Sequence, residues 1–344
     1  MPTMRAAIWS DKRFELREED VPDIVPGCVL VRVRNCGICG SDLHFYRGEF
    51  PSPQDLRMGH EISGEVVGVG EGVAHVSAGQ PVAIEPVEVC RTCVYCYTGR
   101  EQLCPERKFL GTMLPGAFAD YVLAPSYIVH PLPDGVDFEV GSLVEPLAVT
   151  VHGLRQVALE FGERVVVLGS GTIGLMAIVA ARALGAKEVL ATARYPHQAE
   201  MARALGATFV AQAGDVAVGE LLGALDGRGP EVVVETVGGV ANTVNEAIAL
   251  AQSGGRVSVV GIFSNQPQVN MTLAVLKEVA LIGGITYGHI NGRSDFEVAL
   301  EIARRYADDM RKVITHRVAL DDIAAGFATA NDKSQNSIKV TVAV

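Results

Sequence analysis

The segment RVVVLGSGTIGLMAIVAARA, residues 164–183, contains the turn that decides the fold. A short apolar run leads into Gly169-Ser-Gly171-Thr172-Ile173-Gly174, and an alanine-rich helical stretch follows. In such a turn the first glycine makes the tight bend, the second lets the backbone approach a pyrophosphate, and the third allows close packing of helix on strand. The helix N-terminus adds N–H donors and a favourable dipole. We predict a dinucleotide-binding turn; a tight turn of purely structural role is the alternative.

The residues after this turn repeat a pattern of strand, helix and strand. The candidate strands are 164–169, 188–193, 208–210, 231–236, 256–261 and 280–285. Apolar strands without polar alternation are buried on both faces, as in a parallel sheet covered by helices. The fold class we predict is therefore α/β plus β, with a Rossmann doubly wound parallel-sheet domain over residues 151–289.

The first 150 residues have another pattern. Short β-rich runs such as 28–35 and 61–70 alternate with Gly and Pro turns, which is typical of irregular, mostly antiparallel β structure. The tail contains two helical stretches, 295–307 and 320–330, and it ends in the strand-like run 338–344.

The composition and charge of the chain indicate which kinds of partner it does not bind. With 344 residues, 49% of them hydrophobic, the chain has enough apolar material for two packed domains. The net charge of -11 argues against nucleic acid and against an anionic membrane surface. The longest uncharged apolar stretch, 165–181, is too short and too rich in glycine to span a bilayer, and the N-terminus is charged where a signal peptide is apolar. We expect a cytoplasmic protein with a small-molecule substrate.

The choice of cofactor depends on the end of the second strand. An acidic residue there binds the ribose 2′-hydroxyl of NAD, but this strand ends in Ala193-Arg194-Tyr195. Arg194 is suited to pair with a 2′-phosphate, or it is an ordinary solvated arginine. The missing carboxylate slightly favours NADP over NAD.

All seven cysteines lie in the first third of the chain, and five of them belong to two groups of candidate metal ligands. The spacing Cys90-x2-Cys93-x2-Cys96-x7-Cys104 favours structural zinc over a redox pair or an iron–sulfur cluster. Cys39, His60, Glu61 and Glu145 are each ordinary alone. Together they form the mixed donor set of a catalytic zinc with an open position.

The motifs GICGSDLH, MGHEISGEVVGVGEGV, VEPLAVTVHG, VLGSGTIG and KSQNSIKV, with the four-cysteine run, occur in one order over essentially the whole chain. In this the chain resembles the zinc-dependent medium-chain dehydrogenase/reductase (alcohol dehydrogenase) family. Glu61 and Glu145, in their motifs, are most similar to those of the polyol (sorbitol-type) and threonine dehydrogenase branch.

The resemblance implies two zinc ions per chain. Cys39, His60 and Glu61 would bind the catalytic ion, with Glu145 a ligand or a close partner, and Asp42 would orient His60. Cys28 and Cys36 would be packing residues. Ser41 would take the substrate proton and His44 would pass it to solvent.

The resemblance also implies a domain arrangement. A GroES-like, mostly β catalytic domain would span 1–150, with 290–344 returning to it and a zinc lobe at 88–106. The active site would lie in the cleft beside the Rossmann domain, and a homodimer or homotetramer is expected. The cofactor would be bound by a set of residues at the ends of the Rossmann strands: Gly169, Gly171, Thr172, Ile173, Gly174, Arg194, Val237, Val260, Gly261, Ile285 and Thr286.

The reaction implied is hydride transfer between an alcohol and a nicotinamide cofactor, with zinc as the Lewis acid. The pocket segment 284–289 has Thr286-Tyr287 where sorbitol-type enzymes have an Arg-Tyr pair. We therefore expect a secondary alcohol or polyol, with amino-alcohol (threonine-type) and sugar-acid substrates as alternatives. Phe45, Tyr46 and His289 would flank the substrate or serve packing. A zinc-free reductase and a non-catalytic NADPH-binding protein are the rival functions.

Overall fold

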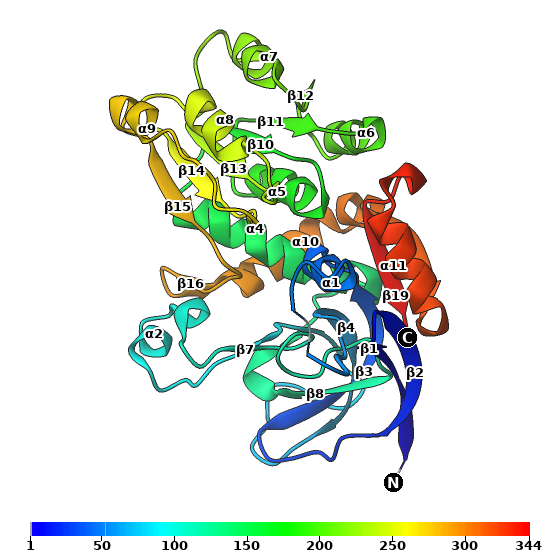
Figure 1. Ribbon diagram of the computed structural model, residues 1–344. Coiled ribbons are helices and arrows are strands. Elements are labelled where there is room, and N and C mark those ends of the chain that lie inside the picture. The colour runs from blue at the N-terminus through cyan, green and yellow to red at the C-terminus, as the bar shows by residue number, and fades with distance from the viewer. Residues whose placement is uncertain (1, 52) are drawn as a thin grey trace. The chain divides into compact units, whose positions relative to one another are not determined.

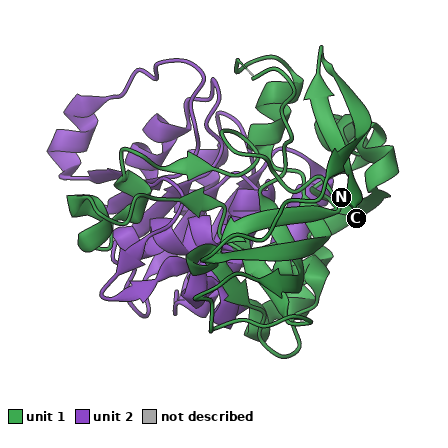
Figure 2. Ribbon diagram, turned by 90° about the horizontal axis from the view of Figure 1, so that it is seen from below, with its two compact units in different colours: residues 1–145, 303–344 green, residues 146–302 purple. Residues whose placement is uncertain are grey.

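The structure is a computed structural model that describes residues 2–51 and 53–344. The chain folds into two compact units, coloured separately in Figure 2. Unit 1 runs up to Glu145 and includes Ala303–Val344, and unit 2 is Pro146–Ile302. Both boundaries fall inside helices, α4 (Val144–Gln156) and α10 (Asp295–Lys312) (Figure 1).

Unit 2 is built on a six-stranded parallel sheet. Its strands are β10 (Arg164–Leu168), β11 (Glu188–Ala193), β12 (Phe209–Gln212), β13 (Val232–Glu235), β14 (Arg256–Val259) and β15 (Ala280–Gly283). Their order is β12-β11-β10-β13-β14-β15, and every neighbouring pair is parallel. This order reverses direction beside β10, as in a doubly wound dinucleotide-binding sheet. The predicted fold class is confirmed.

Helices cover both faces of this sheet. They are α5 (Thr172–Ala183), α6 (Pro196–Ala204), α7 (Ala217–Ala224), α8 (Thr243–Leu250) and α9 (Met271–Lys277). Val166, Val233 and Val257 on one face pack against α7 and α8, whereas α5 and α6 pack on β10, β11 and β12. A short hairpin of β16 (His289–Ile290) and β17 (Arg293–Ser294) precedes α10. Strands buried on both faces explain the uninterrupted apolar runs of the sequence.

Unit 1 is mostly β. Its strands are β1 (Thr3–Ser10), β2 (Arg13–Asp20), β3 (Cys28–Gly37), β4 (Glu61–Val69), β5 (Pro81–Ile84), β6 (Val87–Glu88), β7 (Lys108–Phe109), β8 (Tyr121–Pro125), β9 (Val129–Pro131), β18 (Ile314–Ala319) and β19 (Lys339–Ala343). The main sheet has the order β18-β19-β3-β4-β5-β9, with β8 also paired to β3. Because β19 pairs antiparallel with the end of β3, the C-terminal strand is part of the same sheet as the N-terminal strands.

Short helices complete unit 1. They are α1 (Gly40–Tyr46), α2 (Val94–Tyr97), α3 (Phe138–Gly141) and α11 (Ile323–Asn331), with 3-10 turns η1 (Glu101–Leu103), η2 (Ser126–Ile128), η3 (Leu320–Asp322) and η4 (Lys333–Gln335). Phe327 of α11 contacts the rings of Phe14 and Phe118, so the tail supplies part of the core. Cys36 is fully buried in that core, and Cys28 is half-buried. Among the described residues no helix combines the length and the apolar character needed to cross a bilayer.

Candidate active site and metal centres

The first helix of unit 1 brings four of the predicted site residues together. Cys39 is the N-cap of α1, and the Asp42 carboxylate accepts a hydrogen bond of 2.9 Å from the Cys39 backbone N–H. The other oxygen of Asp42 lies 3.5 Å from Nδ1 of His60, which directly precedes β4. The opposite ring nitrogen of His60, Nε2, lies 3.3 Å from the Ser41 hydroxyl. Asp42 therefore holds Cys39 and His60 in one cluster.

This cluster is buried and electrostatically negative. His60 is 9% exposed and Asp42 is fully buried. Burial lowers the pKa of His60, but the charges of Asp42 and the Cys39 thiolate raise it, and the net result is a pKa well above its ordinary value. A positive charge is thus favoured at this position, which is the electrostatic condition that a divalent cation requires.

Two glycines are needed for this arrangement. Gly59 has a φ of +98°, and a Cβ there would lie 2.9 Å from the Cys36 sulfur and from the Phe118 backbone nitrogen. Gly37, at the end of β3, faces Glu61, and a Cβ there would lie 1.8 Å from a Glu61 carboxylate oxygen. Only glycine fits these two positions next to the site.

Glu61 is engaged by a lysine that the sequence analysis did not single out. The Lys339 ammonium lies 2.6 and 2.7 Å from the two Glu61 oxygens and donates a further hydrogen bond to the carbonyl of Ile38. Lys339 is 2% exposed and Glu61 is fully buried. Burial lowers the pKa of Lys339, but Glu61, and more weakly Cys39 and Glu145, raise it above its ordinary value.

The remaining carboxylate, Glu145, lies in the first turn of α4 and is 7% exposed. Its effect on Lys339 places it in the same electrostatic neighbourhood as Cys39 and Glu61. In this structure Cys39 and His60 are close together, while Glu61 faces Lys339. A thiolate, an imidazole and a buried carboxylate are the donors of a catalytic zinc site, so the residues present fit that metal.

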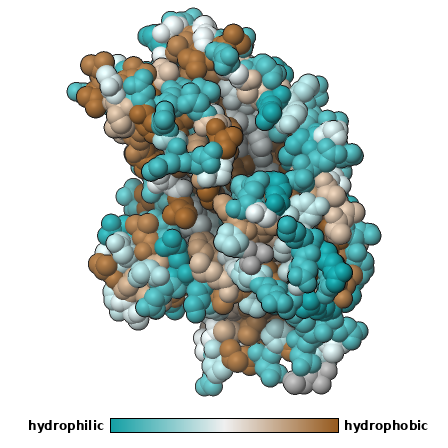
Figure 3. All heavy atoms as spheres, viewed as in Figure 1, coloured by the Kyte–Doolittle hydropathy of each residue, from teal (hydrophilic) through white to brown (hydrophobic). Residues whose placement is uncertain are grey.

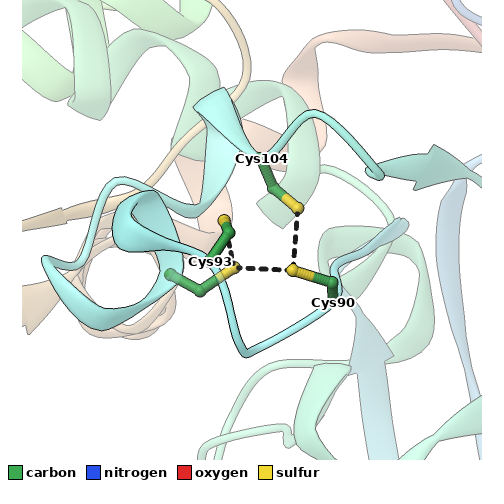
Figure 4. A group of neighbouring side chains, drawn as sticks. Cys90, Cys93 and Cys104 are labelled. Atoms are coloured by element: carbon green, nitrogen blue, oxygen red, sulfur yellow. Dashed lines mark hydrogen bonds between the residues drawn. The ribbon is translucent and has the colours of Figure 1, made fainter.

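The four cysteines of the lobe form a much tighter group (Figure 4). Their sulfur atoms all lie within 4.8 Å of one another, and in the described part of the chain no other set of three or more His, Cys, Asp or Glu ligand atoms is so close. The Sγ–Sγ distances are 3.5 Å for Cys90–Cys104, 3.6 Å for Cys93–Cys96 and 3.9 Å for Cys90–Cys96. Zn–S bonds of about 2.3 Å in a tetrahedron place sulfurs about 3.8 Å apart. The lobe fits a closed zinc site.

Two of these thiols have shifted pKa values, in opposite directions. The Thr92 backbone N–H donates to the Cys90 sulfur at 3.5 Å, and this and the Thr92 side chain lower the pKa of Cys90 to about 6. Burial, with the neighbouring thiols, raises the pKa of Cys96 to about 12. The Cys90 thiolate therefore forms readily, whereas Cys96 would lose its proton on binding a cation.

The glycine turn of unit 2 has the geometry that the sequence predicts. Gly169 has a φ of +97°, and a Cβ on Gly174 would lie 1.9 Å from the Gly169 carbonyl oxygen. Gly171 is the N-cap of α5, and a Cβ there would meet nothing within 4 Å. The space beside Gly171 is thus open at a helix N-terminus, so the residues present fit a pyrophosphate there.

The loops that follow β13 and β14 are both packed against one buried side chain, Glu235. The fully buried Glu235 accepts hydrogen bonds from the backbone N–H groups of Val237 and Gly238, at 2.8 and 3.0 Å. A Cβ on Gly261, which follows Val260, would lie 2.4 Å from the second Glu235 oxygen. Val237 itself is 47% exposed. Since the carboxyl ends of parallel strands lie together, these loops are at the same end of the sheet as the glycine turn.

The segment between β15 and β16 is held in place by hydrogen bonds to a buried aspartate. Asp295 is fully buried and accepts hydrogen bonds from His152 Nδ1 at 2.6 Å and from the Gly288 backbone N–H at 3.0 Å. Arg155 binds the other Asp295 oxygen. This network fixes the segment in which Thr286 has a φ of +50°, a conformation unfavourable for a β-branched residue. Ile285 beside it is 41% exposed.

Four other predicted residues lie at the surface or against the core. Arg194 directly follows β11, is exposed, and lies over the ring of Tyr195. The ring of Tyr46 contacts Trp9 and Phe327, so its surroundings favour the packing role over a substrate contact. Phe45 packs on the same core, and His289 is exposed on β16.

Sequence reasoning missed Lys339, Glu49, Glu235 and Asp295. One signal was available for Lys339: a lysine inside the apolar run SIKVTVAV is buried only if an acid pairs with it. For Glu49, which contacts His44, no local pattern exists, because an acid five residues after a histidine is common on any surface.

Comparison with known proteins agrees with this geometry. A family model described as "Alcohol dehydrogenase GroES-like domain" matches residues 25–134, and one described as "Zinc-binding dehydrogenase" matches residues 172–305. Sorbitol dehydrogenase of Bacillus subtilis (strain 168) is 31% identical, in an alignment that covers 98% of this chain and 97% of that protein. The 2-dehydro-3-deoxy-L-galactonate 5-dehydrogenase of Pseudoalteromonas atlantica is 34% identical, over 94% of each chain.

The fold is shared with solved structures over its whole length. A protein from Sinorhizobium meliloti 1021, described as a zinc-binding dehydrogenase and bound to NADP, superposes with a TM-score of 0.91. It is 30% identical, and the match covers 100% of both chains.

Proposed function

This chain belongs to the zinc-dependent medium-chain dehydrogenase/reductase family, and from that premise we propose that it oxidises a secondary alcohol or polyol, or reduces the matching ketone, with NADP as the preferred cofactor. The observation that carries the proposal is the buried cluster at the start of α1, in which Asp42 lies beside both Cys39 and His60 and the Ser41 hydroxyl lies 3.3 Å from the His60 ring. The names of the relatives, which include a sorbitol and a sugar-acid dehydrogenase, support this substrate class.

The roles of the chain's own residues follow from their positions. Cys39 and His60, with Glu145 or Glu61, would hold the zinc ion, and the lobe cysteines would hold a second one. When bound, zinc supplies Lewis-acid polarisation of the substrate oxygen, and the nicotinamide supplies the hydride acceptor. Ser41 takes the substrate proton, because its hydroxyl is next to the ligand histidine. Asp42 keeps the His60 ring oriented through Nδ1.

The preference for NADP rests on the end of β11. The chain there offers the exposed Arg194 and no acid, and a carboxylate at this place is what would favour the ribose 2′-hydroxyl of NAD. A guanidinium can bind a 2′-phosphate through two parallel hydrogen bonds. The NADP-bound S. meliloti protein supports the same choice.

A substrate panel tests the proposal. We expect reduction of NADP, followed by absorbance, with at least one secondary alcohol or polyol, and slower reduction of NAD. Threonine and a sugar acid belong in the panel as the alternative substrates. In Arg194→Ala the kcat/KM for NADP should fall by about ten-fold, the effect of losing roughly 1.4 kcal/mol of phosphate binding, while that for NAD stays the same.

Arg203→Ala, an exposed arginine on α6, is the matched control and should leave both cofactors unaffected. An Arg194→Ala enzyme with the cofactor preference of the wild type would disprove the arginine's role. A folded, zinc-loaded protein that turns over nothing in the panel would disprove the proposed activity itself.

We further propose that the chain forms a homodimer through the edge of its parallel sheet. β15 is the last strand of the sheet as described, and its sequence ALIG is uncharged. The adjacent α9 exposes Met271, Val275 and Leu276 at 56%, 67% and 78%. Apolar side chains also gather over α9 in Figure 3. An uncovered, apolar strand edge can pair with the same edge of a second copy about a two-fold axis.

The dimer has a direct test by size-exclusion chromatography with light scattering. The wild type should have twice the mass of the 36.4 kDa chain, and Leu276→Lys should shift it toward one chain, because the charge would be buried at the interface. Met113→Lys, at a 66% exposed site in unit 1, is the control. A Leu276→Lys protein with unchanged mass would mean that this edge is not the interface.

A further inference from the structure

His44 lies on the same helical face as Ser41, three residues away on α1. A histidine can pass a proton on only if one ring nitrogen has a free lone pair, and the partner of the other nitrogen decides which one that is. The proposed reaction leaves that partner unassigned. The structure supplies one.

Glu49 is that partner, and the turn after α1 brings it back to the helix. Gly48 has a φ of +71°, which reverses the chain, and the Glu49 backbone N–H donates to the His44 carbonyl at 2.9 Å. The Glu49 carboxylate then contacts Nδ1 of His44. The next residue, Phe50, stacks on the imidazole with ring centroids 4.6 Å apart and 25° between the planes. One face and one nitrogen of the His44 ring are therefore fixed.

Arg47 holds the carboxylate in place from the other side. Its guanidinium donates to both Glu49 oxygens, at 2.5 and 2.9 Å, and to the side-chain oxygen of Asn331 on α11 at 3.3 Å. Arg47 Nη2 also lies 3.3 Å from His44 Nδ1, because both nitrogens contact the same oxygen of Glu49. Arg47, and to a lesser extent His44, lower the pKa of Glu49 to about 2. Glu49 is thus a carboxylate throughout the working pH range, so it accepts a hydrogen bond but does not store a proton.

We propose that Glu49 is a positioning residue of the proton relay, which keeps the neutral His44 protonated on Nδ1 and leaves the Nε2 lone pair to receive the substrate proton. This inference rests on the proposed function. In alcohol oxidation the hydride goes to the nicotinamide, and the proton released through Ser41 is taken at His44 Nε2. The Nδ1–H bond to Glu49 stays intact, and the Nε2 proton then leaves to water or buffer. The role is that of the acid in a Ser-His-Asp triad, which orients the imidazole without taking its proton.

The first test compares Glu49→Ala with Glu49→Gln. The amide oxygen of glutamine still accepts the Nδ1 hydrogen bond, whereas alanine cannot. We expect kcat of Glu49→Ala to fall by about ten-fold or more, the usual effect of losing the partner that orients a functional histidine, with the KM for NADP unchanged. Glu49→Gln should keep most of the activity. In Glu49→Ala, imidazole buffer should restore part of the rate, and the solvent deuterium isotope effect on kcat should rise.

Glu85→Ala is the matched control, because Glu85 contacts Nε2 of His130 at 3.1 Å outside the relay. It should leave kcat and the isotope effect at their wild-type values. If Glu49→Ala keeps the wild-type kcat and isotope effect, or if it loses activity only through KM, the positioning role is wrong.

A measurement without turnover separates this inference from the proposed function. Nitrogen-15 NMR of the imidazoles, with His44→Gln to assign the signal, should show the His44 proton on Nδ1 in the wild type and a mixture of tautomers in Glu49→Ala. If no alcohol is oxidised but this tautomer shift occurs, the activity is wrong and the positioning contact stands. An Nε2-protonated wild type would overturn the inference whatever the activity.

Discussion

His60→Ala is expected to abolish alcohol oxidation while the protein stays folded. The His60 ring lies between Asp42 and Ser41 and is the imidazole donor of the proposed catalytic site. Loss of the metal removes several kcal/mol of transition-state stabilisation, which corresponds to a fall in kcat/KM of about 10³-fold or more. Zinc analysis should give two ions per chain in the wild type and one in His60→Ala.

Two further variants test whether the loss of activity is specific to His60 as a zinc ligand. Asp42→Asn should keep both zinc ions but lower kcat by about 10–100-fold, because the ring of His60 loses its charged partner. His130→Ala, a half-buried histidine paired with Glu85, should affect neither zinc nor rate. The assignment of His60 fails if His60→Ala keeps two zinc ions and measurable turnover.

Lys339→Met is expected to destabilise the protein more than any surface substitution. The change leaves the Glu61 carboxylate fully buried and without the ammonium that contacts both of its oxygens. Breaking one partner of a buried ion pair costs about 3–5 kcal/mol in the free energy of unfolding. Urea unfolding followed by fluorescence of the single tryptophan, Trp9, measures this, since Trp9 is in the core of unit 1.

The double variant Glu61→Gln with Lys339→Met should recover most of the loss, because no buried charge remains unpaired. Lys312→Met is the control, since Lys312 pairs with Asp309 at 2.8 Å on an exposed face, and such pairs contribute at most about 1 kcal/mol. Equal stability of Lys339→Met and the wild type would mean that the Lys339–Glu61 pair does not stabilise the fold.

The two ion pairs of the site also differ in how they depend on pH. The pKa of Glu49 is lowered to about 2, so its bonds to Arg47 and His44 are present above the ordinary glutamate pKa and are lost only as the pH falls through about 2. Lys339 has a raised pKa, so its bond to Glu61 is complete below the ordinary lysine pKa and is lost only above it. Both contacts are therefore intact at neutral pH.

Some features of this structure are determined by short stretches of sequence. The turn at Gly169–Gly174 is specified locally, because a Cβ on Gly174 cannot coexist with the Gly169 carbonyl. The apolar runs give the parallel sheet, since its central strands β10, β11 and β13 are buried on both faces. The cysteine spacing of the lobe places four sulfurs in one stretch of fifteen residues, and in the fold these sulfurs lie within 4.8 Å of one another.

The tertiary structure alone decided which charges meet. Lys339 and Glu61 are 278 positions apart and become partners because β19 pairs with β3, next to the start of β4. Asp295 reaches the Gly288 backbone and His152, 143 positions apart from it, only when α4 and α10 pack in unit 2. Even Glu49 needs the reversal at Gly48 before it contacts His44. A pattern of residue types records which side chains are able to ionise, but the partner of each charge is set by which strands and helices become neighbours.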